Sequence, residues 1–197
     1  MARSEIGAII LAAGEGARFR AAGGAGSKLL ALYQGKSLVR HVADATLSSG
    51  IAGVIVVTGH DDAALRAELA GLPLTFVVNE DYASGMGSSL RVGFAARPAT
   101  WKAAIILLGD MPLVDAALIA QVADAYTDEA AAVVPTYEGV RGNPVLLSAR
   151  LAPEIAHLSG DMGARQILRG RDDVRDLPVT SAAARLDIDT PEALNKL

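Results

Sequence analysis

Short runs of apolar, often β-branched residues alternate with alanine-rich stretches along most of this chain. The apolar runs predict strands at 6–11, 54–58, 74–78, 104–108 and 131–135. The alanine-rich stretches predict helices at 38–49, 61–70, 87–97 and 115–126. Strands and helices that alternate in this way form a parallel sheet covered on both faces. Since 51% of the 197 residues are apolar, we expect a single α/β domain with a doubly wound, mostly parallel sheet.

The alternation changes after Gly139. Residues 141–147 predict a turn that leads into an edge strand, and short helices are expected at 152–157 and 163–169. We expect this region to fold back over the sheet as a lid or platform. Near the C-terminus, residues 186–192 alternate polar and apolar side chains like a strand. They then enter a helix that Thr190 caps and Pro191 begins.

The first predicted strand ends in the glycine turn Gly14-Glu15-Gly16. Such a turn leaves backbone N–H groups free and lets a phosphate chain approach closely. Arg18 and Lys28 follow in the same loop. Two cations beside a glycine turn indicate a polyanionic ligand, and a nucleoside triphosphate fits this description best.

Spacing excludes two commoner glycine motifs. The dinucleotide-binding fingerprint requires a glycine at position 19, where this chain has Phe19, so a hydride-transferring enzyme is disfavoured. The triplet Gly35-Lys36-Ser37 is similar to the end of a P-loop, but the glycine that a P-loop needs at position 30 is replaced by Leu30. We interpret the triplet as a turn in which Ser37 caps the next helix.

Polar residues stand where the predicted parallel strands end, which is the edge of the sheet where ligands bind. Gly14, Asn79 and Asp110 follow the first, third and fourth strands. An aspartate at the end of a central strand suits Mg²⁺, whereas the alternative is that Asp110 caps a turn. Asp187 and Asp189 would point to one side of the C-terminal segment. Either is a candidate second ligand, or both support the start of the helix.

A second glycine turn, from Ser84 to Leu90, opens a predicted helix. Its N–H groups and hydroxyls are suited to a base edge or a ribose. A plain helix N-cap would explain Ser88 or Ser89 but not the two glycines. The three histidines have no spacing typical of metal ligands: His41 and His157 are expected on the surface or in the core of helices, and His60 at the end of a strand.

Composition excludes several classes of function. A net charge of −4 without a cluster of Lys and Arg argues against nucleic acid as a partner. The absence of cysteine excludes thiol catalysis, disulfides and cysteine zinc sites. The first residues lack the pattern of a signal peptide, and no apolar run reaches the ~18 residues of a membrane-spanning helix. We therefore expect a cytoplasmic enzyme.

Six motifs in one order give the chain a resemblance to the nucleotidyltransferases that activate molybdenum cofactor, most closely the molybdenum cofactor cytidylyltransferases. The motifs are Leu11-Ala12-Ala13-Gly14-x-Gly16-x-Arg18 with Lys28-Leu29-Leu30, Ser84-Gly85-Met86-Gly87-Ser88-Ser89-Leu90, Gly109-Asp110-Met111-Pro112, Arg141-Gly142-Asn143-Pro144-Val145, Gly160-Asp161-Met162-Gly163-Ala164-Arg165 and Asp187-Ile188-Asp189-Thr190-Pro191.

The resemblance implies one nucleotidyltransferase domain over residues 1–197, with the nucleotide on residues 1–136 and the acceptor on 137–197. It implies Mg²⁺-dependent transfer of CMP from CTP to the phosphate of the molybdenum cofactor pterin, with release of pyrophosphate. A molybdenum hydroxylase would then receive the product.

The resemblance also implies a role for each matching residue. Arg18 and Lys28 would neutralise the triphosphate, and Asp110 and Asp189 would hold Mg²⁺. The nucleotide would meet Leu11, Ala12, Ala13, Gly14, Gly16, Asn79, Gly85, Gly87, Ser88 and Ser89. The acceptor would meet Arg141, Gly142, Asn143, Asp161, Gly163 and Arg165.

The chain departs from the family pattern at two places. The loop between Arg18 and Lys28 is longer than usual and rich in glycine and alanine, so we expect it to be mobile until substrate binds. Asn143 stands where these cytidylyltransferases usually carry histidine, which leaves the acceptor open. Ala13, where GTP-using members tend to carry glycine, favours CTP. A guanylyltransferase, a sugar-phosphate nucleotidyltransferase and an accessory protein that carries the cofactor are the alternatives.

Overall fold

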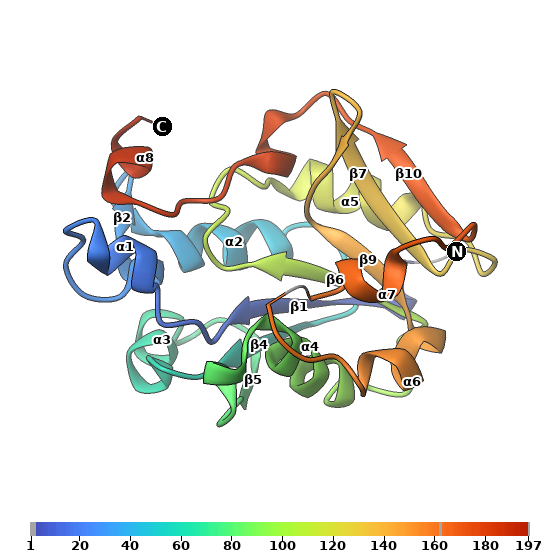
Figure 1. Cartoon of the computed structure of the whole chain (residues 1–197), viewed down its shortest axis with the longest axis horizontal. Coiled ribbons are helices and arrows are strands. Elements are labelled where there is room, and N and C mark those ends of the chain that lie inside the picture. Colours follow the sequence, from blue (N-terminus) through green and yellow to red (C-terminus); the bar gives the residue numbers. More distant parts are fainter. Residues whose placement is uncertain (1–2, 162, 197) are drawn as a thin grey trace.

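The computed structural model describes residues 3–161 and 163–196, and an eight-stranded sheet runs through its centre. The strand order is β10-β7-β9-β6-β1-β4-β5, and β8 pairs with β7 (Figure 1). The strands are β1 Ile6–Ala12, β4 Val54–Thr58, β5 Thr75–Val78, β6 Ala103–Leu108, β7 Ala132–Tyr137, β8 Val140–Arg141, β9 Val145–Ser148 and β10 Val174–Pro178. A separate hairpin joins β2 Leu32–Tyr33 to β3 Lys36–Ser37.

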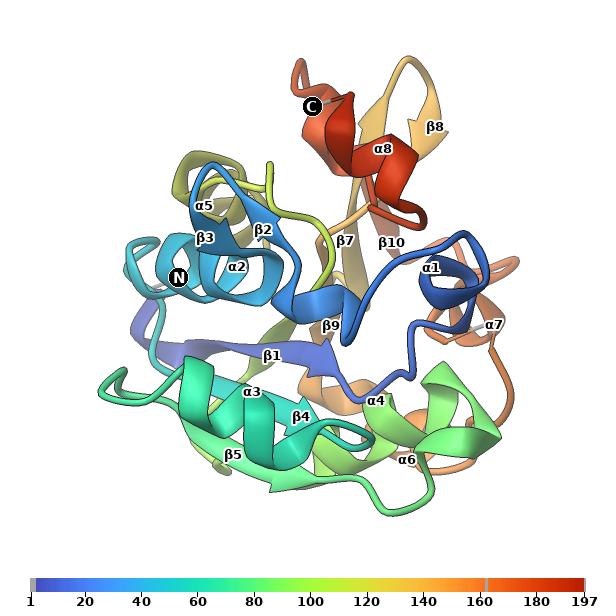
Figure 2. The ribbon, with the colours of Figure 1, turned by 90° about the vertical axis from the view of Figure 1, so that its left-hand side faces the viewer.

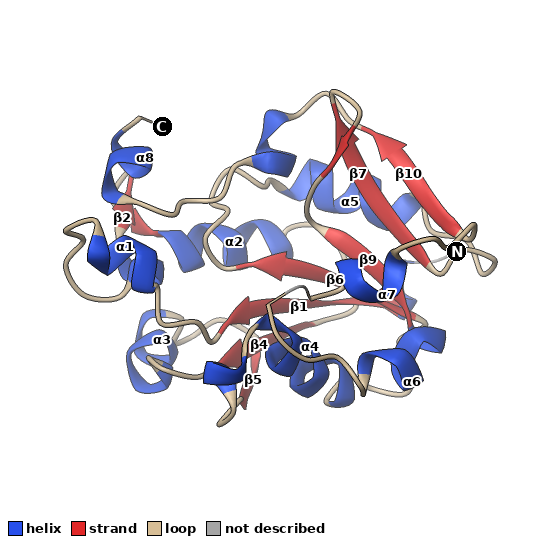
Figure 3. Ribbon diagram, in the orientation of Figure 1, coloured by secondary structure: helices blue, strands red, loops and turns tan. Residues whose placement is uncertain are grey.

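Helices cover both faces of this sheet, as Figure 3 shows. They are α1 Ala17–Ala21, α2 Leu38–Leu47, α3 Asp62–Glu68, α4 Met86–Ala95, α5 Ala116–Asp124, α6 Ala152–Ile155, α7 Arg165–Leu168 and α8 Pro191–Asn195. Helices α2, α3 and α5 pack on one face and α4, α6 and α7 on the other. The predicted α/β class with a doubly wound, mostly parallel sheet is therefore confirmed.

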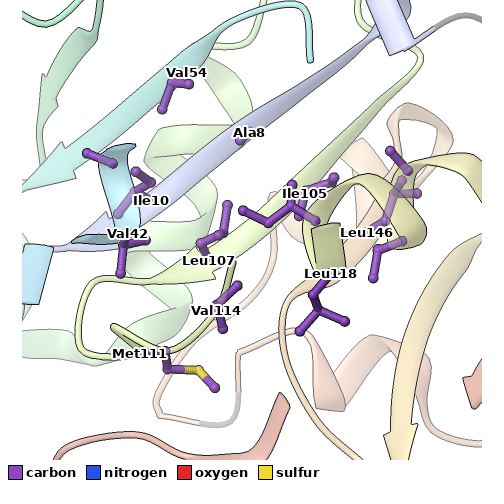
Figure 4. Packing of buried hydrophobic residues seen from close by; sticks show 14 of the residues in the cluster. Ala8, Ile10, Val42, Val54, Ile105, Leu107, Met111, Val114, Leu118 and Leu146 are labelled. Carbon is purple, nitrogen blue, oxygen red and sulfur yellow. The ribbon is translucent and has the colours of Figure 1, made fainter. Parts of the chain in front are cut away.

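Strand β1 divides the core into two halves because its successive side chains point to opposite faces. Ala8 and Ile10 pack with α2 and α5, and Figure 4 shows this half of the core. Ile9 and Leu11 pack with α4 on the opposite face. Strand β1 pairs in parallel with both β4 and β6, so residues that follow these three strands emerge at one edge of the sheet.

Polar caps fix the start of three helices. The hydroxyl of Ser37 accepts from the Arg40 N–H at α2, and the Asp115 carboxylate accepts from the Leu118 N–H at α5. Thr190 caps α8 in the same way. Such a cap stabilises a helix by about 1 kcal/mol. The four long helices predicted from the sequence begin and end within a few residues of the observed ones.

The region after Gly139 differs from expectation. Strand β9 lies between β7 and β6, antiparallel to both, so the predicted edge strand is wrong. Leu146 and Leu147 are fully buried on opposite faces, and only an interior strand buries both faces. Strand β10, polar in sequence, was not expected. Both strands belong to the sheet, so the expected lid is wrong for them, whereas the predicted short helices become α6 and α7.

The C-terminal segment crosses the end of β6 before it enters α8. Residues 186–189 form no strand, contrary to their alternating pattern. Instead the Ile188 N–H donates to the carbonyl oxygen of Asp110 at 3.0 Å, and the Ile188 side chain is buried. Among the described helices, none has the length and apolar character needed to span a membrane.

Candidate active site

A cavity of about 550 Å³ lies at the carboxyl ends of β1 and β6, the edge of the sheet that faces the viewer in Figure 2. Its size is typical of a small-molecule site. Its lining comes from six segments: the end of β1 with the glycine turn and α1, the Lys28-Leu29 turn, the start of α4 with the turn before it, the end of β6, the loop at Asp161, and the C-terminal crossing. The predicted residues that line it are Leu11, Ala12, Ala13, Gly14, Gly16, Arg18, Lys28, Gly85, Ser89, Asp110, Asp161 and Asp189.

The first glycine turn shapes one wall of the cavity. Gly16 has a φ of 65°, and a β-carbon there would lie 2.9 Å from the β-carbon of Lys28. Glycine therefore allows the Lys28 loop to approach the turn closely. An added β-carbon on Gly14 would meet no atom within 4 Å. The space beside Gly14 is thus open to a ligand.

Three carboxylates converge in the cavity. Asp110 leaves β6, and Asp187 and Asp189 come from the C-terminal crossing. One oxygen of each lies within 4.8 Å of the others. Because Ile188 is bonded to the Asp110 carbonyl and buried, its two neighbours are held beside this strand end. Asp187, which we predicted from the sequence as the alternative to Asp189, thus lies in the same cluster.

Lys28 and Arg18 contact these carboxylates. The Lys28 ammonium is 2.5 Å from Asp110 Oδ2 and 3.2 Å from Asp189 Oδ1. The Arg18 guanidinium pairs with Asp189 Oδ2. The side chains of Lys28 and Asp110 are only 13% and 16% exposed, so this pair is largely withdrawn from water. The two cations predicted to meet a triphosphate therefore lie against the predicted metal ligands.

The electrostatics of Asp110 are unusual for a carboxylate beside a lysine. Burial raises the pKa of Asp110, and the Lys28 ammonium offsets only part of that effect while the charge of Asp187 adds to it. Asp110 Oδ1 is buried and has no hydrogen-bond partner among the described residues. An unpartnered buried oxygen costs about 1–3 kcal/mol, more when charged, so this atom is poised to accept a cation or a proton.

The cavity as a whole is acidic. Among the described residues, five carboxylates and two cations line it, so negative charge exceeds positive charge by three. The carboxylates are Glu15, Asp110, Asp161, Asp187 and Asp189, and the cations are Arg18 and Lys28. A polyanionic ligand would be repelled from this lining unless additional positive charge accompanied it.

The second glycine turn contributes less than predicted. Asn79 is buried, and its amide donates to the hydroxyls of Ser88 and Ser89 at 2.8 and 3.0 Å. The Ser88 hydroxyl shares its one proton between the carbonyls of Asp81 and Gly85, which lie 2.9 and 2.8 Å away. Neither serine caps α4 with its side chain. Gly85 and Ser89 line the cavity, whereas Asn79, Gly87 and Ser88 support the turn from behind.

The predicted acceptor residues are divided between three places. Asp161 lines the cavity, because the Gly87 N–H holds the loop before it by donating to the Gly160 carbonyl at 2.9 Å. Gly163 packs beneath Met86, and Arg165 begins α7. Met162 of the same motif lies outside the described residues.

The remaining acceptor motif does not line this cavity, although Asn143 lies beside Leu107 and Leu108 at the end of β6. Arg141 on β8 pairs with Asp176, with Nε 2.7 Å from Oδ1. Gly142 packs against the carbonyl of Ala184, and the Asn143 N–H donates to that carbonyl at 2.8 Å. The structure therefore does not bring Arg141, Gly142 and Asn143 to the cavity.

The sequence analysis missed Tyr82 and did not single out Met86 within its glycine turn, and both line the cavity. Both follow β5 at the same edge of the sheet, which is the signal that identifies them in retrospect. His60 does not line it. Its ring instead lies beside Tyr82, with the centroids 5.8 Å apart.

Comparison with known proteins gives relatives that match nearly end to end. The chain is 32% identical to nicotine blue oxidoreductase of Paenarthrobacter nicotinovorans, over 96% of this chain and 94% of that protein. The structure of this chain is similar to that of Rv0371c from Mycobacterium tuberculosis H37Rv in complex with manganese. The two have 28% sequence identity and a TM-score of 0.83, over 98% of this chain and 97% of that one.

A third match shares the fold. A nucleotidyl transferase from Methanothermobacter thermautotroptrophicus has 21% identity and a TM-score of 0.85, over 98% of this chain and 95% of that one. The MobA-like NTP transferase domain family matches residues 8–175, which include the glycine turn, Lys28 and Asp110. The chain therefore belongs to the family of MobA-like NTP transferases.

Proposed function

We propose that this protein is a divalent-metal-dependent cytidylyltransferase that transfers CMP from CTP to the phosphate of the molybdenum cofactor pterin. One observation carries the proposal: three converging carboxylates lie beside Lys28 and an open glycine turn in a single cavity. This is the combination of parts that nucleotidyl transfer requires, because the protein must position a triphosphate and neutralise its charge.

The residues present fit a divalent ion. Carboxylate oxygens are the ligands that Mg²⁺ and Mn²⁺ prefer, and Asp110 Oδ1 has no partner among the described residues. The manganese complex of Rv0371c, a protein of the same fold and 28% identity, supports this interpretation. Asp110, Asp187 and Asp189 would hold the ion, which would neutralise charge on the triphosphate and on the pyrophosphate leaving group.

Lys28 and Arg18 have two sets of anions to contact. In the structure both cations pair with carboxylates. When those carboxylates are neutralised instead by a divalent ion, Lys28 and Arg18 become available to donate hydrogen bonds to phosphate oxygens. Both lie next to the open space at Gly14, where a triphosphate would enter. They would then stabilise the charge that develops on pyrophosphate.

The bonds exchanged define the reaction. An oxygen of the acceptor phosphate attacks the α-phosphorus of CTP, and the bond from that phosphorus to the bridging oxygen of the β-phosphate breaks. The electron pair leaves with pyrophosphate. No covalent enzyme intermediate is needed, and the contribution of the protein is positioning and charge stabilisation. A molybdenum hydroxylase is the proposed recipient of the dinucleotide product.

Pyrophosphate release tests the proposal. Wild-type protein is assayed with CTP or GTP and Mg²⁺, each with and without molybdenum cofactor. We expect release that requires the cofactor and is faster with CTP, because Ala13 lines the cavity where a glycine would leave more room for a purine. Faster release with GTP would make the enzyme a guanylyltransferase. Release with sugar phosphates alone would contradict the pterin acceptor, and cofactor binding without any release would indicate a carrier.

A second candidate function is that of an oxidoreductase, because the relative named nicotine blue oxidoreductase matches this chain over nearly its whole length. An oxidoreductase would need a redox cofactor in the same cavity. Phe19 replaces the third glycine of the dinucleotide fingerprint, and the excess of carboxylates disfavours an anionic dinucleotide. Metal-independent oxidation of NADH or NADPH with a dye acceptor would favour this candidate over nucleotidyl transfer.

A further inference from the structure

The wall of the cavity formed by the start of α4 offers few polar groups to a ligand. The side chains of Asn79 and Ser88 are buried and hydrogen-bonded to their own turn. A nucleotide base therefore cannot be gripped by these groups without breaking the turn that presents them. The side chains left on this wall are those of Tyr82, Ala83, Met86 and Ser89. Met86 is 40% exposed, so a large part of the wall is apolar.

Tyr82 packs against two neighbouring residues, Gly59 and His60. A β-carbon on Gly59 would lie 2.9 Å from the β-carbons of both Tyr82 and Ala13, so these residues pack closely around that glycine. The His60 ring lies beside the Tyr82 ring at an angle of 66°, and its Nδ1 is 3.4 Å from the Tyr82 hydroxyl. An aromatic ring fixed in this way loses little conformational entropy when a ligand packs on it.

The place of Tyr82 along the cavity decides which part of a nucleotide it meets. Ala13 lies between Tyr82 and the glycine turn, because it packs around Gly59 with the former and directly precedes Gly14. Phosphates on the glycine turn would therefore put the attached nucleoside beside Ala13 and Tyr82. The carboxylate cluster contacts Lys28, which packs against Gly16 at the end of the glycine turn away from Ala13.

We propose that Tyr82 is the stacking platform for the base of the bound nucleotide, with the Met86 side chain beside it. This inference rests on the function proposed above, and it makes Tyr82 a binding residue for the base rather than for the phosphates. Stacking of a base on an aromatic side chain depends on the ring face and not on the hydroxyl. Phenylalanine should therefore replace Tyr82, and leucine should not.

Calorimetric titration in Mg²⁺ tests this assignment. The probes are whichever of CTP and GTP the wild type binds more tightly, and inorganic tripolyphosphate, which has no base. We expect Tyr82→Leu to weaken nucleotide binding by about tenfold or more, as removal of a base-stacking ring does elsewhere. Tyr82→Phe should bind the nucleotide like wild type. Tripolyphosphate should bind all three proteins equally.

A matched control is available outside the cavity. Tyr33 also lies against a histidine, His41, with ring centroids 5.4 Å apart, but it does not line the cavity. Tyr33→Leu should leave both titrations unchanged. Equal nucleotide binding by Tyr82→Leu and wild type would overturn the inference and leave the proposed function intact. Parallel losses for nucleotide and tripolyphosphate would also overturn it, because they indicate a structural role. A wild type that binds neither nucleotide would overturn both proposals.

Discussion

The Lys28 side chain follows a loop rich in glycine and alanine, yet only 13% of it is exposed. Its ammonium contacts two of the three carboxylates that form the proposed metal site. Two cations that compete for the same oxygens repel each other, so a bound divalent ion and Lys28 in this position are incompatible. Lys28 should therefore weaken metal binding when nucleotide is absent. When metal and nucleotide are both bound, it should instead promote pyrophosphate release.

The first prediction follows from this competition. In the absence of nucleotide, Lys28→Met should bind Mn²⁺ about tenfold more tightly than wild type, which is a change of about 1.4 kcal/mol in binding free energy. The repulsion between an ammonium and a divalent ion that share carboxylate ligands is large enough to account for this change. Pyrophosphate release by Lys28→Met should fall by on the order of 10²-fold, as when one preorganised donor is lost. Electron paramagnetic resonance of free Mn²⁺ measures the first effect.

Lys36→Met is the matched control, because Lys36 pairs with Asp44 at 2.6 Å on the surface, away from the cavity. Its Mn²⁺ affinity and activity should equal those of wild type. Weaker Mn²⁺ binding by Lys28→Met would mean that Lys28 orders the carboxylates instead of competing for them.

Asp110 supplies a second prediction, on pH. Burial raises its pKa in the folded protein. Its contribution to stability is therefore present below the ordinary carboxyl pKa of about 4 and is lost as pH rises through the raised value. Asparagine does not titrate. In metal-free buffer Asp110→Asn should be more stable than wild type at neutral pH, and this advantage should shrink as pH falls towards about 4.

Urea unfolding at a series of pH values, with a chelator present, measures the difference. Asp173 gives a control of opposite sign, because its hydrogen bond with Arg171 lowers its pKa. Asp173→Asn should be slightly less stable than wild type at neutral pH, and this deficit should shrink on acidification. A pH-independent advantage of Asp110→Asn would show that removal of the titrating carboxyl is not its cause.

Among the elements, those with local signals were predictable from the sequence. Helix α5 has Asp115 at its cap and apolar residues at helical spacing, and it forms as expected. The position of β9 depends instead on pairing with β6, about forty residues earlier, and with β7. Its run of apolar residues does show burial on both faces, but not which neighbours provide it. Strand β10 is an edge strand with exposed Arg175 and Asp176, so periodicity does not distinguish it from a loop.

The start of α4 gives a prediction about packing between elements. Gly85 has a φ of 104°, and a β-carbon there would lie 2.5 Å from Asp161 Oδ1 and 2.6 Å from the carbonyl carbon of Gly160. Gly85→Ala should therefore strain the backbone and push the Gly160 loop off the helix. We expect a loss of about 2–4 kcal/mol in the free energy of unfolding, from strain plus the broken hydrogen bond to Gly87.

Gly71→Ala separates these two effects. Gly71 has a φ of 81°, but an added β-carbon meets nothing within 4 Å. Gly71→Ala should therefore lose only the free energy that comes from backbone strain at positive φ, about 1–2 kcal/mol. Urea denaturation compares the two variants, and equal losses would show that the Gly160 loop moves aside at no cost.

At the scale of the whole molecule, the site is assembled from segments far apart in the chain. The glycine turn and Asp110 were predictable, because both follow strands of a parallel sheet and such ends share an edge. The pairing of Lys28 with Asp110, 82 residues later, was not, since no local pattern specifies it. The placement of Arg141 beside Asp176 was equally hidden, because it requires β8 and β10 to flank the same strand.

The C-terminal crossing brings two of the three carboxylates to the cavity, yet every strand of the sheet ends by Pro178. A chain that ends after Leu186 should therefore keep its sheet. It would lose the buried Ile188 side chain, a loss of about 1.5–3 kcal/mol and a modest fall in Tm. It would also lose Asp187 and Asp189, so Mn²⁺ with CTP should no longer raise its Tm as it raises that of the full chain.

A chain that ends after Thr190 keeps both aspartates and lacks only α8, which has no buried residue. It should retain the Mn²⁺-dependent rise in Tm, measured by differential scanning fluorimetry. If the chain that ends after Leu186 retains the rise as well, the metal binds elsewhere and the carboxylate cluster is not its site.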